Sequence, residues 1–146
     1  MYEDLVRIIE EADDSVEFAS FGEGISDDWV KLAEKRLGIT FPKSYIWWLK
    51  NYNGGEVYGE EIYSVYCIDF DKVVGGDIVY INELSRKNDS SFKDKLIISE
   101  TGDEVFYFDL SNGLKNDEYP VYELHSNILY AHSFAEFLKR RITEYV

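Results

Sequence analysis

The spacing of apolar residues divides the chain into a helical first third, a strand-rich middle and a helical end. Leu5, Ile8, Ile9 and Ala12 recur at helical spacing, which predicts a short amphipathic helix over residues 3–12. Similar patterns predict four more helices, at residues 26–38, 42–52, 77–87 and from 133 to the end of the chain.

The apolar stripes of three of these helices can be named. Helix 26–38 is expected to bury Trp29, Leu32, Ala33 and Leu37, and helix 77–87 has its apolar spacing at Ile78, Ile81 and Leu84. Ser133-Phe134-Ala135-Glu136 is a capping box that opens the last helix. The residues expected on one face of that helix are Phe134, Phe137, Leu138, Ile142 and Tyr145.

Runs rich in β-branched and aromatic residues predict strands between these helices. They lie at residues 16–21, within 56–70, and at 96–99, 104–110, 121–124 and 128–131. Short turns between consecutive strands favour antiparallel pairing. The order of elements predicts an α+β fold with N-terminal helices, a central antiparallel sheet with an inserted helix, and a C-terminal helix packed on the sheet. The length fits one domain over residues 1–146.

The helix boundaries are most clearly marked between residues 37 and 55. Gly38 is expected to end the second helix in a left-handed conformation. Pro42 suits the first position of the third helix, where its missing N–H costs nothing. The triplet Asn53-Gly54-Gly55 permits the positive φ values that end this helix.

The third helix carries more large apolar residues than one face can hold. Tyr45, Trp48, Leu49 and Tyr52 form one buried stripe, and Ile46 and Trp47 lie off it. Either the helix is buried on two sides, or Trp47 is exposed and serves as an anchor for a partner.

The charge is strongly acidic, with 29 acidic and 15 basic residues and a formal net charge of -14. Such a chain does not bind nucleic acid or an anionic membrane through bulk electrostatics, and it attracts a basic partner instead. The simpler interpretation is that the acidity maintains solubility. No apolar run is long enough for a membrane span or a signal peptide. With one cysteine, Cys67, and hence no internal disulfide, the sequence predicts a cytoplasmic protein.

Residues able to support catalysis or metal binding are few. The sequence has neither a phosphate-binding glycine loop nor a nucleophile elbow. His125 and His132 are too few for a zinc site, and Cys67 lies in an apolar run typical of a small core residue. On a strand, Asp69 and Asp71 would share one face and could hold a cation, although such a pair is more often solvated or a helix cap. The sequence therefore predicts neither an enzyme nor a cofactor.

The acidic and aromatic composition permits a basic protein partner, and residues 56–63 would suit such a partner because they mix acidic and tyrosine side chains. The alternative is an ordinary solvated strand edge. The full set of candidate interface residues is Trp47, Glu56, Tyr58, Glu60, Glu61, Tyr63, Asp69 and Asp71.

The chain resembles the SUKH superfamily, in its branch related to the yeast Smi/Knr cell-wall regulators. That branch has a helix ending in Leu-Gly, a Leu-Pro-like step, a Tyr three residues later, an apolar pair and then Asn-Gly-Gly. Gly102-Asp103 before an apolar strand, Pro120-Val121 and the aromatic last helix are also similar to the family. The Leu-Gly to Asn-Gly-Gly block is represented here by Leu37-Gly38, Phe41-Pro42, Tyr45, Trp48-Leu49 and Asn53-Gly54-Gly55.

This resemblance implies a single α+β domain that acts as a binding scaffold without shared catalytic residues. Many bacterial members look like immunity proteins, which bind and neutralise polymorphic toxins, often nucleases. Eukaryotic relatives regulate cell-wall synthesis or act as adaptors. The resemblance therefore implies an immunity protein, for which the acidic charge predicts a basic toxin, or alternatively a cytoplasmic adaptor of the Smi/Knr type.

Overall fold

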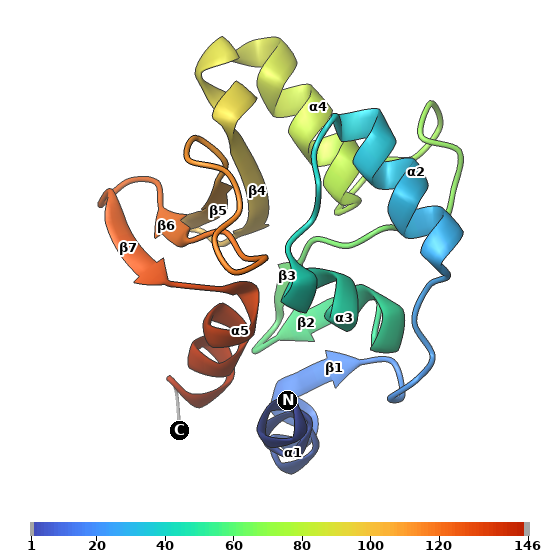
Figure 1. The fold of residues 1–146 in the computed structure, drawn as a ribbon. Coiled ribbons are helices and arrows are strands. Elements are labelled where there is room, and N and C mark those ends of the chain that lie inside the picture. The colour runs from blue at the N-terminus through green and yellow to red at the C-terminus, as the bar shows by residue number, and fades with distance from the viewer. Residues whose placement is uncertain (1, 145–146) are drawn as a thin grey trace.

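The computed structural model describes residues 2–144, in which seven strands form one antiparallel sheet. Each strand pairs with its neighbours in sequence, so the order across the sheet is β1 to β7 (Figure 1). The strands are β1 Val16–Phe18, β2 Gly55–Val57, β3 Glu60–Ile62, β4 Lys95–Glu100, β5 Val105–Asp109, β6 Val121–Glu123 and β7 Ile128–Ala131.

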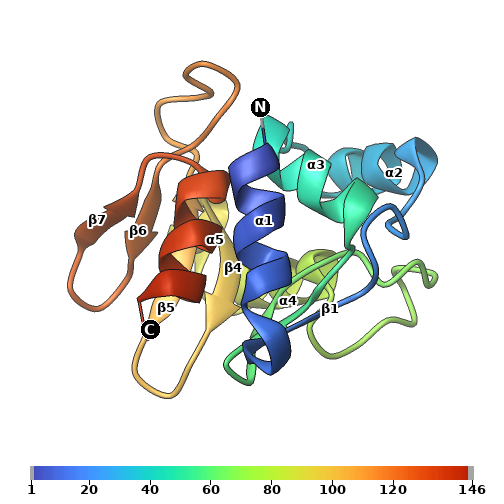
Figure 2. The same ribbon diagram turned by 90° about the horizontal axis from the view of Figure 1, so that it is seen from below.

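Five α-helices and two short 3₁₀ helices accompany the sheet in the described part of the chain. In both ribbon views α1 and α5, the first and last helices, lie side by side (Figures 1 and 2). The inserted helix α4 packs against β4 and α2. The predicted α+β fold is confirmed. The helices are α1 Glu3–Glu11, α2 Asp27–Leu37, α3 Lys43–Asn51, α4 Ile78–Asn88 and α5 Phe134–Thr143, and the 3₁₀ helices are Asp13–Ser15 and Ser90–Asp94.

The predicted ends of α2 and α3 are confirmed, with one shift. Gly38 is left-handed at φ 70° and its N–H bonds to the carbonyl oxygen of Glu34 at 2.8 Å. Pro42 is the residue before α3 rather than its first residue, because its backbone is extended. All three residues of Asn53-Gly54-Gly55 have positive φ.

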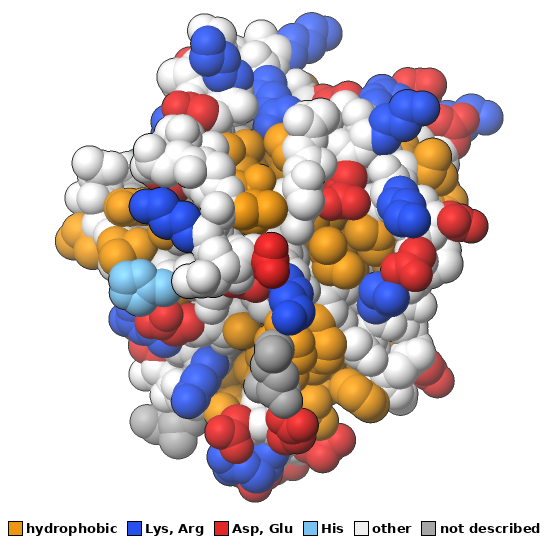
Figure 3. Space-filling model, in the orientation of Figure 1, with side chains coloured by type: hydrophobic (Ala, Val, Ile, Leu, Met, Phe, Trp, Pro, Cys, Tyr) orange, Lys and Arg blue, Asp and Glu red, His pale blue; other side chains and the backbone are white. Residues whose placement is uncertain are grey.

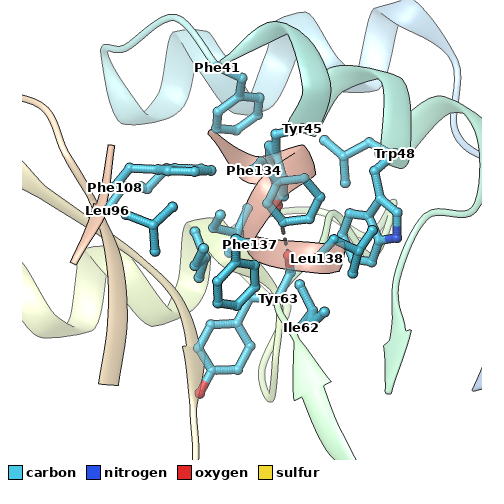
Figure 4. Packing of buried hydrophobic residues seen from close by; sticks show 14 of the residues in the cluster. Phe41, Tyr45, Trp48, Ile62, Tyr63, Leu96, Phe108, Phe134, Phe137 and Leu138 are labelled. Atoms are coloured by element: carbon cyan, nitrogen blue, oxygen red, sulfur yellow. Dashed lines mark hydrogen bonds between the residues drawn. The ribbon is translucent and has the colours of Figure 1, made fainter. Parts of the chain in front are cut away.

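Tyr45 lies at the centre of the core (Figure 4). Its ring packs edge-on against the rings of Phe41, Phe108 and Phe134 at centroid distances of 5.0 to 5.8 Å. Its hydroxyl donates to the carbonyl oxygen of Tyr63 at 2.7 Å, so the ring is buried without leaving that hydroxyl unpaired. The core thus joins α3, α5 and the sheet through aromatic side chains.

Three sequence predictions were wrong in detail. Leu32 and Leu84 were expected on buried helix faces but are 50% and 43% exposed, and Val30 and Val79 are buried in their helices instead. The strand region expected to reach residue 70 ends at Ile62. Beyond the isolated bridge at Ser64, the chain turns away from the sheet in a loop at 65–76.

The start of α5 matches the predicted capping box in most respects. The hydroxyl of Ser133 accepts from the N–H of Glu136 at 3.1 Å, and the Glu136 carboxylate accepts from the N–H of His132 rather than that of Ser133. Phe134, Phe137 and Ile142 are buried as predicted. Tyr145, also expected on this face, lies outside the described residues.

Candidate protein-binding surface

Three glutamates lie directly opposite one another on neighbouring strands. The register pairs Glu17 of β1 with Glu56 of β2, and Glu56 with Glu61 of β3. Directly opposed residues share one face of the sheet with Cβ atoms about 5 Å apart. We call Glu17, Glu56 and Glu61 the glutamate row. Like charges at this spacing repel, so the row concentrates negative potential on one face of the sheet.

Two tyrosines and a fourth glutamate border the row. The Tyr63 hydroxyl donates to Glu100 at 2.9 Å, and the Tyr66 hydroxyl donates to Glu61. Burial and the bond to Glu61 raise the pKa of Tyr66 to about 12, and burial followed by the bond to Glu100 raises the pKa of Tyr63. Both phenols therefore remain hydrogen-bond donors to the carboxylates at neutral pH.

The other two candidates in the hairpin, Tyr58 and Glu60, contact α5 instead. Tyr58 occupies the turn between β2 and β3 with φ 52°, and its hydroxyl donates to the carbonyl oxygen of Ile142 at 3.1 Å. Glu60 forms an ion pair with Arg141. Glu60 is separated from the glutamate row because successive strand residues point to opposite faces, and Glu60 is next to Glu61.

Asp69 and Asp71 lie in the loop at 65–76 rather than on a strand, and each has a partner. The Asp69 carboxylate accepts from the N–H of Asp71 at 3.0 Å. Asp71 pairs with Arg36 of α2 at 2.9 Å. Among the described residues, no three or more His, Cys, Asp or Glu side chains are placed to hold a metal ion.

Trp47 is half-buried, and its contacts support the two-sided burial of α3. Its ring stacks on Tyr2 at 4.5 Å and meets Tyr52 edge-on at 5.9 Å. Together with Phe21 and Val6 it lines a hollow of about 260 Å³. Figure 3 shows hydrophobic side chains gathered around α1 and α3, in the lower centre of the view. Trp47 is therefore separate from the glutamate row.

The residues weighed for catalysis come from separate segments, the loop at 65–76 and the two ends of β7. His125 and His132 are exposed on either side of β7. Cys67 is half-buried with φ 60°, and burial, with a smaller effect of Asp77, raises the pKa of its thiol. A raised pKa disfavours the thiolate that a nucleophile requires.

The structure thus brings Glu56, Glu61 and Tyr63 together out of the eight predicted interface residues. It adds Glu17, Tyr66 and Glu100, which the sequence reasoning missed. Glu17 belongs to the predicted segment 16–21, but only the pairing of β1 with β2 places it beside Glu56. The residues around Glu17 do not indicate which strand it pairs with or in what register.

The fold is that of a small α+β protein that carries the glutamate row on one face of its sheet. A family model described as SMI1-KNR4 cell-wall, SUKH_6, matches residues 27–138, which is most of the chain. The chain belongs to this family, and the predicted SUKH relationship is confirmed. Membership supports a role in protein–protein interaction. Every helix in residues 2–144 is too short or too polar to span a bilayer.

Proposed function

We propose that this chain is a non-catalytic immunity protein that binds and neutralises a cognate basic toxin domain in the cytoplasm. The observation that carries the proposal is the glutamate row, in which Glu17, Glu56 and Glu61 oppose one another across three strands. Family membership supports a protein-binding role, and the net charge of -14 favours a basic partner.

The row is suited to binding because its charges are unfavourable in the free protein. Opposed like charges in a sheet cost on the order of 0.2–1 kcal/mol per pair. Lysine or arginine side chains of a partner would replace this repulsion with attraction. The same field would accelerate encounter with a basic surface. Tyr66 adds an amphipathic ring, a residue type enriched at protein interfaces. Tyr63 is only 9% exposed, so it contributes through its hydroxyl bond to Glu100 rather than through its ring.

A nuclease toxin fits this surface well. An enzyme that binds nucleic acid presents cations to the phosphate backbone. An acidic sheet face would cover those cations and compete with the nucleic acid for them. No catalytic step of the immunity protein is required, since stoichiometric binding is sufficient for neutralisation.

Co-expression with any toxin encoded beside this chain tests the proposal. We expect the native chain to rescue growth and to form a stable complex. Glu56→Gln should slow association and weaken the complex about tenfold, whereas Asp117→Asn, which removes the same charge from an exposed loop, should not. Absence of any complex with the adjacent toxin, together with recovery of a cellular assembly in a pull-down, would favour the Smi/Knr-type adaptor instead.

A further inference from the structure

A concave site, distinct from the glutamate row, lies at the edge of the sheet formed by β1. A hollow of about 350 Å³ opens between α1, β1 and the segment that follows β1. Its walls include the rings of Phe18, Phe21 and Tyr52. The Tyr52 ring lies 5.5 Å from that of Phe18 and 5.6 Å from that of Phe21. Phe21 is 53% exposed, so one wall projects into solvent.

Two polar groups of this hollow lack partners. Tyr52 is only 2% exposed, and its hydroxyl has no hydrogen-bond partner among residues 2–144. Glu10 of α1 also lines the hollow and makes no ion pair within the same residues. Burial and then the Glu10 charge raise the pKa of Tyr52, and both residues line the same hollow. A buried hydroxyl without a partner costs about 1–3 kcal/mol, so a ligand that supplies a donor would recover that energy.

We propose that this hollow, the Glu10 pocket, binds a lysine or arginine side chain of a protein partner. Aromatic faces attract cations, a carboxylate pairs with them, and the Tyr52 oxygen can accept an N–H bond. An anion would be repelled by Glu10 and by the net charge of -14. The inference rests on the proposed function, because it adds a second contact for the same basic partner.

The position of the pocket relative to the glutamate row strengthens the inference. Glu17 and Phe18 are consecutive residues of β1, so their side chains point to opposite faces of the sheet. Glu17 belongs to the row and Phe18 to the pocket. A basic segment that wraps around the β1 edge would therefore place one cation on each face of this strand.

Peptide titration followed by amide chemical shifts tests the pocket without the toxin. The probe is acetyl-Gly-Ser-Arg-Ser-Gly-amide, and the control peptide has Gln in place of Arg. We expect the arginine peptide to shift the amides of Glu10, Phe18, Phe21 and Tyr52, with millimolar affinity. Glu10→Gln and Tyr52→Phe should each weaken binding about fivefold or more. Asp117→Asn removes the same charge from an exposed loop outside both sites and should leave affinity for the pocket unchanged within twofold.

The possible results distinguish a failure of the pocket proposal from a failure of the immunity proposal. Equal shifts with the glutamine peptide, or unchanged affinity in Glu10→Gln, would overturn the pocket. Tyr52→Phe should keep or raise the thermal midpoint, since it removes an unpaired hydroxyl, so its weaker binding would not reflect unfolding. If the chain fails to bind the adjacent toxin but keeps this arginine-dependent response, the toxin assignment fails while the pocket stands.

Discussion

Arg141 of α5 forms an ion pair with Glu60 of β3, 81 residues earlier in the chain. The Arg141 side chain is only 5% exposed, and its guanidinium lies 4.9 Å from the centre of the Phe106 ring. Carboxylate oxygens of Glu104 and Glu144 lie 3.7 and 3.3 Å from its Nη1 atom. One buried cation thus joins the C-terminal helix to the hairpin that carries two residues of the glutamate row.

Loss of this cation should destabilise the fold. We expect Arg141→Met to lower the free energy of unfolding by about 3 kcal/mol, because the carboxylates around it lose their shared counter-ion. Lys139→Met, at an exposed position of the same helix, is the matched control and should change it by less than about 0.5 kcal/mol. Urea titration measures both, and equal effects would show that Arg141 has no special role.

Glu60 should therefore behave differently from its neighbour in sequence. Glu60→Lys would place a second cation against Arg141, and we expect it to impair folding. The charge reversal Glu61→Lys should chiefly impair partner binding. Circular dichroism melts combined with the complex assay separate the two effects, and equal thermal midpoints for the two variants would contradict this assignment.

Glu123 makes stability depend on pH. Burial alone would raise its pKa, but backbone N–H groups of Val105, His125 and Ser126 donate to the carboxylate and hold the pKa at about 2. This value lies below the ordinary 4.5, so the contribution is complete above pH 4.5 and is lost as the pH falls toward 2.

We expect Glu123→Gln to lower the free energy of unfolding by about 1–3 kcal/mol at neutral pH and to flatten its fall below pH 4.5. Asp103→Asn, in an exposed turn, should retain the native pH profile. Urea midpoints measured from pH 2 to 7 provide the test, and parallel profiles for Glu123→Gln and the native chain would contradict it.

Removing one negative charge from the glutamate row should stabilise the free protein. Glu56 faces like charges on both sides, so Glu56→Gln should raise the free energy of unfolding by about 0.2–1 kcal/mol at low salt. The gain should shrink at 1 M salt, where screening shortens to about 3 Å. Thermal melts at two salt concentrations check this, and a loss of stability would show that the row is not repulsive.

Gly55 should tolerate no side chain. A Cβ atom there would lie 2.0 Å from the backbone oxygen of Glu17, and its φ is 131°. We expect Gly55→Ala to lower the free energy of unfolding by more than about 3 kcal/mol. Gly59→Ala, with φ 78° and no heavy atom within 4 Å, should cost only about 1–2 kcal/mol. If the two variants lose similar free energy of unfolding, backbone strain at positive φ is sufficient to explain both losses, and the clash with the Glu17 oxygen contributes nothing.

Features fixed by neighbouring residues could be predicted from the sequence. Gly38, Asn53-Gly54-Gly55 and Ser133 set helix ends through their own backbone or side-chain geometry, and each lies near its predicted place. The buried stripe of α3 was also predictable, because Tyr45, Trp48 and Leu49 repeat at helical spacing.

Features fixed by distant residues could not be predicted. The apolar run from Val65 to Ile68 looks like a strand, yet Asp77 accepts from the N–H of Tyr66 and also from the first N–H groups of α4, which holds this segment in a loop. Leu32 is exposed because of which face of α2 packs against α3 and α4, and this packing is set by residues distant in the sequence. The glutamate row depends on strand register, which is a property of the sheet rather than of any one segment.

The strictly sequential strand order has a consequence for synthesis on the ribosome. From β2 onward each strand pairs with one that has already emerged, so the sheet can grow from β1 toward β7 in the order of synthesis. Helix α5, the last of the described elements, brings Arg141 to Glu60, which emerges much earlier. We expect a released chain that ends before residue 134 to assemble the sheet without the ion pair between Arg141 and Glu60, which requires α5.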